Sequence, residues 1–218
     1  MLRLIIGNKN YSSWLLRGWL ALKQSGLPFE EQVVPIYDGD WALLRETTDF
    51  APSTGKVPIL WHGDAAVWES LAILDYVNDL SGATRFWPQE RAAHALARSM
   101  ATEMQSGFSA LRKACPTNIR RAYPASPVSE AVQYDIDRIM TLWGQARANF
   151  GGEGSFLFGE FGAADIMFAP VVTRFNTYSL PAPPFARAYM DALAANPFMQ
   201  DWISAAQQET WVIDRFER

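Results

Sequence analysis

The segment from Lys56 to Val77, KVPILWHGDAAVWESLAILDYV, constrains the fold more than any other part of this chain. A Val-Pro pair opens a short apolar run at 57–61, a Gly-Asp turn follows, and a second short run covers 65–68. Apolar residues then recur at steps of three and four, a spacing typical of an amphipathic helix. The sequence therefore predicts a strand, a tight turn, a second strand and a helix in direct succession.

Glu69 and Ser70 stand where the second strand passes into this helix. The first N–H groups of a helix have no backbone partner, and together with the helix dipole they favour an anion. The Ser70 hydroxyl adds a donor, and the Glu69 carboxylate could bind an ammonium group. We therefore expect this pair to hold an amino-acid head group, which carries both charges on one carbon. The alternative is a helix that merely begins with two polar residues.

Pro58 begins the first of the two strands, a place where proline removes no internal hydrogen bond of the sheet. A cis Val57–Pro58 bond would turn the backbone N–H and C=O of Val57 outward, free to pair with an extended peptide ligand. The sequence leaves the isomer open, because most X–Pro bonds are trans.

Composition excludes several classes of function. Of the 218 residues, 49% are hydrophobic and 19% charged, as in an ordinary globular protein with a sizeable core. The net charge is −4 and no basic stretch stands out, so we expect no nucleic-acid partner. One Cys and two His argue against an internal disulfide and against a metal site. No run reaches membrane-spanning length, and we expect a soluble, cytoplasmic protein without a membrane partner.

Strands and helices alternate in the first eighty residues. The expected elements, in chain order, are a strand at 2–6, a helix at 14–24, a strand at 29–36 and a short helix at 41–48. A helix between the first two strands implies a parallel crossover, while the hairpin that follows makes the sheet mixed. This order predicts a small α/β domain with a thioredoxin-like arrangement.

The remainder of the chain is helical in pattern. Residues 81–88 break the periodicity and are expected to link two domains, at 1–80 and 89–218. The helices expected after this linker lie at 90–113, 128–150, 163–178, 185–195 and 197–208. The predicted fold class is therefore α/β plus all-α, with a thioredoxin-like N-terminal domain followed by an all-helical C-terminal domain.

Three segments together resemble the glutathione S-transferase family: NYSSWLLR near the N-terminus, KVPIL with WESLAI, and FGAADIMFAPV late in the chain. Their order and spacing extend the resemblance over nearly the whole chain, to a cytosolic, bacterial, Ser-type member of theta- or zeta-like character. It implies that Val57 and Pro58 form the family's cis-proline loop, where Val57 pairs with the cysteinyl backbone of glutathione. It also implies that Glu69 and Ser70 bind the γ-glutamyl end. The candidates for the glycyl carboxylate are Lys9, Arg45 and Lys56.

The late segment resembles the family's capping motif, in which Ser or Thr is followed three residues later by Asp. Here Gly162 stands in the place of the hydroxyl residue, with Asp165 three positions on. Asp165 can still accept from backbone N–H groups at the start of the helix, so we expect half of the reciprocal capping box.

Glutathione chemistry requires a thiolate, which a hydroxyl group at the N-terminus of the first helix can stabilise together with the helix dipole. The resemblance places this hydroxyl among Tyr11, Ser12 and Ser13 and, because no Cys is present there, disfavours the disulfide-exchanging subclasses. Ser13 lies four residues before Arg17, the spacing of theta-like members. We therefore rank Ser13 slightly above Ser12 as the catalytic residue, with Tyr11 third; the other role open to either serine is that of helix N-cap.

The helical domain is expected to supply an apolar wall for the second substrate. Met104, Phe108 and Leu111 recur on adjacent turns of the first long helix, a spacing that equally fits the core. Arg112 beside them is expected to be the electrostatic partner of an anionic substrate.

The resemblance implies a detoxification enzyme, a glutathione transferase that joins the glutathione thiolate to an apolar electrophile. It further implies glutathione as co-substrate without a metal, and a homodimer. Two alternatives stay open. One is a zeta-like glutathione-dependent maleylacetoacetate isomerase, although Trp14 follows Ser13 where that class has Cys. The other is a non-catalytic binding or scaffold protein with the same fold.

Overall fold

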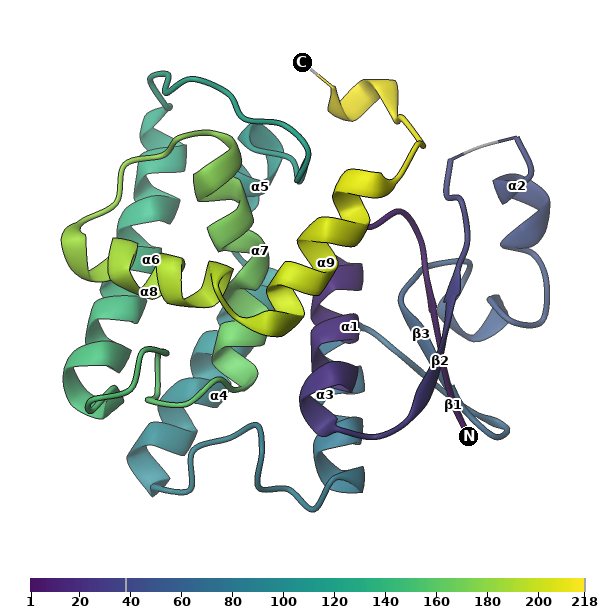
Figure 1. Cartoon of the computed structure of the whole chain (residues 1–218), viewed down its shortest axis with the longest axis horizontal. Coiled ribbons are helices and arrows are strands. Elements are labelled where there is room, and N and C mark those ends of the chain that lie inside the picture. The colour runs from purple at the N-terminus through teal and green to yellow at the C-terminus, as the bar shows by residue number, and fades with distance from the viewer. Residues whose placement is uncertain (38, 218) are drawn as a thin grey trace.

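A four-stranded mixed sheet organises the N-terminal part of the protein (Figure 1). The computed structural model describes residues 1–37 and 39–217. The strands are β1 (Leu2–Ile6), β2 (Phe29–Val33), β3 (Ile59–His62) and β4 (Ala65–Trp68), in the spatial order β2-β1-β3-β4. β1 runs parallel to β2 and antiparallel to β3, and β3 pairs antiparallel with β4. The predicted crossover and hairpin are both confirmed.

Alternating residues of β1 divide the two faces of this sheet. Leu2, Leu4 and Ile6 pack into the large core that includes α1 (Ser13–Ser25) and α3 (Ser70–Leu80). Ile5 points to the opposite face, where a smaller core includes Phe50 and partly buried residues of α2 (Trp41–Leu44). Because this strand is buried on both faces, four of its five residues are apolar; the exception, Arg3, is half-buried and pairs with Asp49 at 2.8 Å.

The C-terminal part consists of helices. Their bounds are α4 (Arg91–Ser106), α5 (Ser109–Ala114), α6 (Glu130–Phe150), α7 (Ala163–Thr177), α8 (Pro184–Ala194) and α9 (Pro197–Gln208). The prediction of one helix over 90–113 is wrong, because the chain turns between α4 and α5. Phe108 has a φ of +60°, and a Cβ atom at Gly107 would lie 2.8 Å from the carbonyl oxygen of Glu103.

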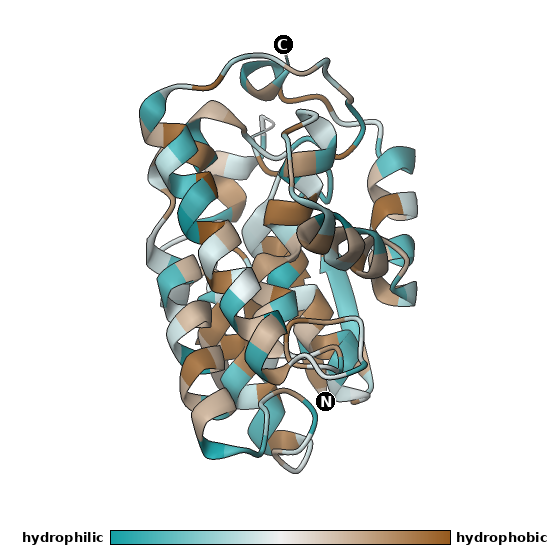
Figure 2. Ribbon diagram, turned by 90° about the vertical axis from the view of Figure 1, so that its left-hand side faces the viewer, coloured by the Kyte–Doolittle hydropathy of each residue, from teal (hydrophilic) through white to brown (hydrophobic). Residues whose placement is uncertain are grey.

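α7 lies at the centre of the molecule and joins its two parts. Almost all of its residues are buried, and it contacts α1 as well as α4 and α8. Apolar residues gather between the helices, while hydrophilic residues lie on their outer turns (Figure 2). One continuous apolar core therefore runs from the sheet into the helical part.

The predicted half of the capping box holds the N-terminus of α7. Asp165 is 1% exposed, and its carboxylate accepts from the backbone N–H groups of Gly162 at 2.9 Å and Leu157 at 3.1 Å. A Cβ atom at position 162 would lie 2.6 Å from the carbonyl oxygen of Phe86, and that oxygen accepts from the N–H of Ala163. The linker carbonyl thus occupies the space that a side chain at position 162 would need, which explains the glycine there.

The C-terminal tail returns to the first loop of the chain (Figure 1). The carboxylate of Glu209 accepts from the backbone N–H groups of Lys9 and Asn10, at 2.6 and 3.0 Å. Further along, the Tyr11 hydroxyl donates to Glu217. These bonds fix the loop that leads into α1. None of the helices among the described residues is long and apolar enough to cross a lipid bilayer.

Candidate functional site

The N-termini of α1 and α3 open into one cavity of about 460 Å³. Its walls come from the β1–α1 loop, the α2 region, the β3 entry and the β4–α3 junction. The lining residues are Ser12, Trp14, Ile36, Tyr37, Trp41, Arg45, Gly55, Lys56, Val57, Pro58, Trp68, Glu69 and Ser70. Two helix N-termini that face one cavity give it a positive potential suited to anionic groups.

The α3 end of the cavity carries the predicted pair. Glu69 is the N-cap residue and its side chain makes no capping bond, so the first N–H groups of α3 lack a side-chain cap. Its φ of +68° with ψ of 127° is a conformation that residues with a side chain rarely adopt. Such strain of about 1–3 kcal/mol persists where the surrounding structure imposes it, often at a functional site. The Ser70 side chain is fully buried at the first position of the helix.

Gln105, at the C-terminal end of α4, contacts both members of this pair. Its side-chain oxygen accepts from the Ser70 hydroxyl at 3.2 Å, and its NH₂ group donates to the Glu69 carboxylate at 3.1 Å. The amide thus offers Ser70 an acceptor and Glu69 a donor, the same two functions that an amino-acid head group would offer. The pair is therefore arranged to bind an acceptor and a donor side by side.

The cis-proline loop forms the cavity wall between the two helix ends. The Val57–Pro58 peptide bond is cis, which answers the point that the sequence left open, and both residues line the cavity. A Cβ atom at Gly18 of α1 would lie 3.1 Å from the Pro58 ring. Glycine at this position allows α1 to approach the loop closely, and this approach brings the N-terminus of α1 to the cavity.

The three candidate hydroxyl groups are placed differently. Ser12 is the N-cap residue of α1 with no side-chain capping bond, and it lines the cavity. Ser13 is 6% exposed in the first turn and is not among the lining residues. The Tyr11 hydroxyl accepts from Arg120 at 2.8 Å as well as donating to Glu217, which occupies it with the tail. The geometry favours Ser12 over Ser13, the reverse of the sequence ranking.

The three basic residues predicted to bind the glycyl carboxylate differ in their position relative to the cavity. Lys56 and Arg45 are exposed and line the cavity. Lys9 does not line it, since its ammonium group pairs with Glu31 at 2.5 Å and lies over the rings of Trp19 and Trp202. Lys9 therefore binds the tail helix α9 to the N-terminal part.

The residues predicted to contact the second substrate are not equivalent. Met104 is 1% exposed, and Phe108 is 6% exposed with its ring 6.5 Å from that of Phe168, so both belong to the core. The Arg112 guanidinium lies 4.9 Å from the ring of Trp14, which lines the cavity. Of the three, Arg112 lies beside the cavity wall.

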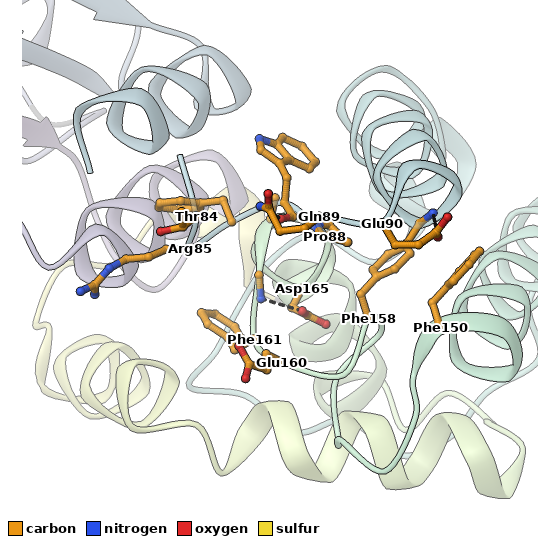
Figure 3. A pocket seen from close by; sticks show the side chains of 16 residues that line it. Thr84, Arg85, Pro88, Gln89, Glu90, Phe150, Phe158, Glu160, Phe161 and Asp165 are labelled. Atoms are coloured by element: carbon orange, nitrogen blue, oxygen red, sulfur yellow. Dashed lines mark hydrogen bonds between the residues drawn. The ribbon is translucent and has the colours of Figure 1, made fainter. Parts of the chain in front are cut away.

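A second cavity, of about 340 Å³, shares no residue with the first (Figure 3). It lies where the linker and the start of α4 meet the segment before α7, and it includes the capping residue Asp165. The stacked rings of Phe150 and Phe158 form one side, with centroids 6.0 Å apart. The described residues offer no group of three or more His, Cys, Asp or Glu that could hold a metal ion.

Several site residues carry no signal in the sequence. Gln105 reaches the site across the interface between α3 and α4, from the turn of α4 that also holds the core residue Met104. Trp14, Tyr37 and Trp41 line the cavity from segments whose contact depends on the tertiary fold. Helical spacing alone could not distinguish these residues from ordinary core or surface positions.

Comparison with known proteins identifies the family. The family model described as "Glutathione S-transferase, N-terminal domain" matches residues 11–80, and "Glutathione S-transferase, C-terminal domain" matches residues 126–205. Together they cover more than half of the 218 residues. The chain belongs to the glutathione S-transferase family, with a thioredoxin-like N-terminal domain and a helical C-terminal domain.

Individual relatives are more distant. Dichloromethane dehalogenase of Methylorubrum extorquens is 44% identical over 70 residues, which is 30% of this chain and 24% of that protein. Glutathione S-transferase 1 of Dianthus caryophyllus is 31% identical over 106 residues, 49% of this chain and 46% of that protein. These matches thus span less than half of the length of either relative. Among solved structures, the chain is similar to a glutathione transferase homologue from Burkholderia GL BGR1 with bound glutathione. The TM-score is 0.69 at 23% identity, and the match covers 94% of this chain and 97% of the other. This similarity shows that the two proteins share a fold.

Proposed function

We propose that the protein is a glutathione transferase that joins the glutathione thiolate to an electrophile. The observation that carries this proposal is the single cavity with Ser12 at one helix N-terminus and Glu69 with Ser70 at the other. Glutathione would place its γ-glutamyl end against Glu69 and Ser70, and its cysteinyl backbone against Val57. Lys56 would attract the glycyl carboxylate.

Ser12 is the proposed activating residue. A serine hydroxyl at the start of α1 can donate a hydrogen bond to the thiolate, and the helix dipole stabilises the same negative charge. Both effects lower the pKa of the bound thiol, so that more thiolate is present near neutral pH. The thiolate then attacks the electrophile, while the thiol proton passes to solvent.

We further propose the substrate type, the oligomeric state and the cellular role of the enzyme. We expect an electrophile with an apolar body, reached from the side of the helical domain, a homodimer in solution, and a role in cytoplasmic detoxification. Sedimentation velocity would test the dimer directly. A binding or scaffold protein would not need the Ser12 hydroxyl group in the same cavity as Glu69 and Ser70.

The first test is isothermal titration of glutathione into the wild-type protein and Ser70→Ala. We expect binding to the wild type and a loss of about 1–3 kcal/mol in the variant, because a buried hydrogen bond to a charged group disappears. Absence of heat with the wild type would favour the binding or scaffold protein. Unchanged affinity of Ser70→Ala would remove Ser70 from the site.

The second test compares Ser12→Ala with Ser13→Ala. The pH dependence of the ultraviolet thiolate absorbance of bound glutathione gives the thiol pKa. We expect Ser12→Ala to raise this pKa by about 1–2 units, since a charge-assisted hydrogen bond contributes about 1.5–3 kcal/mol. Ser13→Ala should leave it unchanged. A rise only in Ser13→Ala would restore the ranking drawn from the sequence.

A further inference from the structure

Three arginines from three helices meet beside the glutathione cavity. Arg17 lies on α1, Arg112 on α5 and Arg174 on α7. Arg17 is fully buried, Arg174 is 5% exposed, and Arg112 is half-buried. The proposed thiol activation does not use any of them.

The three positive charges act on one another. Burial lowers the pKa of Arg17 well below its usual value, and the neighbouring Arg112 and Arg174 lower it further. Burial and then Arg112 lower the pKa of Arg174 to about 10, and burial lowers that of Arg112. Because an arginine does not lose its proton in proteins, these groups remain charged and repel one another.

The part of the chain that the structure describes offers these arginines carbonyl oxygens but no paired carboxylate. Among the described residues, none of the three guanidinium groups forms an ion pair. The carboxylate of Asp135 attracts Arg112 and raises its pKa in part, but this carboxylate also accepts from the backbone N–H of Leu111 at 2.9 Å. Arg17 and Arg174 each donate through Nε to a carbonyl oxygen, of Met167 and Cys115 respectively, both at 2.9 Å. Arg174 also donates through Nη1 to the carbonyl oxygen of Pro170 at 3.0 Å, and Arg112 donates through Nη2 to those of Met104 and Gln105. Carbonyl oxygens accept hydrogen bonds but leave the positive charge in place.

Several donors of the cluster have no acceptor. The Nη1 and Nη2 atoms of Arg17 and the Nε atom of Arg112 are buried and have no hydrogen-bond partner among residues 1–37 and 39–217. Burying a charged group that is neither paired nor fully hydrogen-bonded is costly. A cluster with this excess of charge and donors is suited to an anion.

Trp14 connects this cluster to the reaction site. Its ring lies 4.9 Å from the guanidinium carbons of both Arg17 and Arg112, and the same residue lines the glutathione cavity two positions after Ser12. The ring stabilises both cations without neutralising them. An anion held by the cluster would therefore lie close to the thiolate, with the half-buried Arg112 as the member that it meets first.

We propose that Arg17, Arg112 and Arg174 form a subsite for a carboxylate group of the second substrate. This inference rests on the proposed transferase function and names its substrate class: an electrophile with an apolar body and a carboxylate. The thiolate sulfur would form a bond to the electrophilic carbon, and the leaving group, such as chloride, would depart with the electrons of the bond that breaks. The substrate carboxylate itself takes no part in bond making.

The test uses two unreactive probes of the same shape, 3-nitrobenzoate and 3-nitrobenzamide. Isothermal titration should show that the wild-type protein binds the carboxylate about tenfold or more tightly than the amide, because charge-assisted hydrogen bonds are the stronger kind. The preference should fall to about twofold or less in Arg112→Gln. Arg112→Lys, which keeps the charge, should retain most of it. The matched control is Arg138→Gln on α6, where an arginine paired with Glu103 is lost away from the cluster, and it should retain the full preference.

Several results would overturn the proposal. They are equal affinity of the wild type for the two probes, undetectable binding of both, or a preference that survives in Arg112→Gln. Saturating glutathione should leave nitrobenzoate binding intact; competition would mean that the cluster holds a carboxylate of glutathione instead. Glutathione titration is a separate readout. A preference for the carboxylate probe without glutathione binding would overturn the transferase proposal but support the arginine subsite. Glutathione binding without a preference for the carboxylate probe would support the transferase proposal and overturn the subsite.

Discussion

The backbone of Glu69 is strained at a residue that we propose to bind glutathione. With a φ of +68°, the residue occupies a conformation that glycine adopts far more readily. Its carboxylate meanwhile accepts from Gln105 at the open end of α3. A side chain at this position therefore reduces stability while it places a charged group in the candidate site.

The substitution Glu69→Gly should relieve the backbone strain and at the same time remove the charged side chain from the candidate site. We expect the free energy of unfolding to rise by about 1 kcal/mol, because strain is relieved by more than the added flexibility of the unfolded chain costs. Glutathione affinity should fall about tenfold, which corresponds to about 1.4 kcal/mol. Urea unfolding and isothermal titration measure the two quantities.

Glu69→Gln is the matched control for this prediction. It keeps the strained backbone and an acceptor for Gln105 but removes the negative charge. Its stability should equal that of the wild type, while its glutathione affinity falls. A stability gain in Glu69→Gln, or none in Glu69→Gly, would contradict the assignment of strain to the backbone.

At the scale of elements, the start of α7 depends on a close contact with the linker. The carbonyl oxygen of Phe86 lies where a Cβ atom of residue 162 would be, and it accepts from Ala163 at 2.8 Å. A serine at position 162 could add the missing half of the capping box, worth a few tenths of a kcal/mol (about 0.3) relative to glycine. It would also force a backbone carbonyl to move, and a backbone shift in a packed region costs about 1–3 kcal/mol.

Gly162→Ser should therefore lower the free energy of unfolding by about 1 kcal/mol or more, measured by urea denaturation. The control is Gly144→Ala inside α6, where the added Cβ would lie 3.5 Å from the ring of Phe185, an ordinary contact. That substitution should stabilise the protein by about 0.5–1 kcal/mol through helix propensity. A more stable Gly162→Ser would show that the linker yields and that the cap bond dominates.

At the scale of the whole molecule, the buried Asp165 links stability to pH. Burial raises the pKa of its carboxyl group from 3.8 to about 6, against the opposing effect of backbone N–H groups of Leu157 and Gly162. The folded protein thus holds this proton more tightly than the unfolded chain does. The stabilisation from proton binding is complete below about pH 3.8 and is lost as the pH rises through about 6.

Between about pH 5 and about pH 8, Asp165 alone should therefore lower the free energy of unfolding by about 1 kcal/mol. Because other carboxyl groups also titrate, the quantity to measure is the difference between wild type and Asp165→Asn in urea denaturation at both pH values. On going from about pH 8 to about pH 5, the free energy of unfolding of the wild type should rise relative to that of Asp165→Asn by about 1 kcal/mol. Asp137→Asn, an exposed change on α6, is the control and should show no such change. A difference that is independent of pH for Asp165→Asn would contradict the raised pKa.

Local patterns predicted most of the fold. The hairpin of β3 and β4, the crossover through α1 and the helices from α6 to α9 follow from apolar spacing and turn residues, which act over a few neighbours. The helix break at Gly107 and Phe108 was missed, since apolar spacing continues through it. Glu69 and Ser70 were predicted as a binding pair because a strand passes directly into a helix there, and the structure places both residues at the cavity.

The sequence by itself determined the order of elements through short-range apolar spacing, and the family through the resemblance of three short motifs. It also placed Glu69 and Ser70 at the junction between a strand and a helix. Only the tertiary structure decided which serine faces the cavity, that Gln105 bridges Glu69 and Ser70, and that three arginines gather behind Trp14. These features join residues from helices far apart in the chain. Their contacts depend on how the helices pack around α7, and no local pattern of residues specifies that packing.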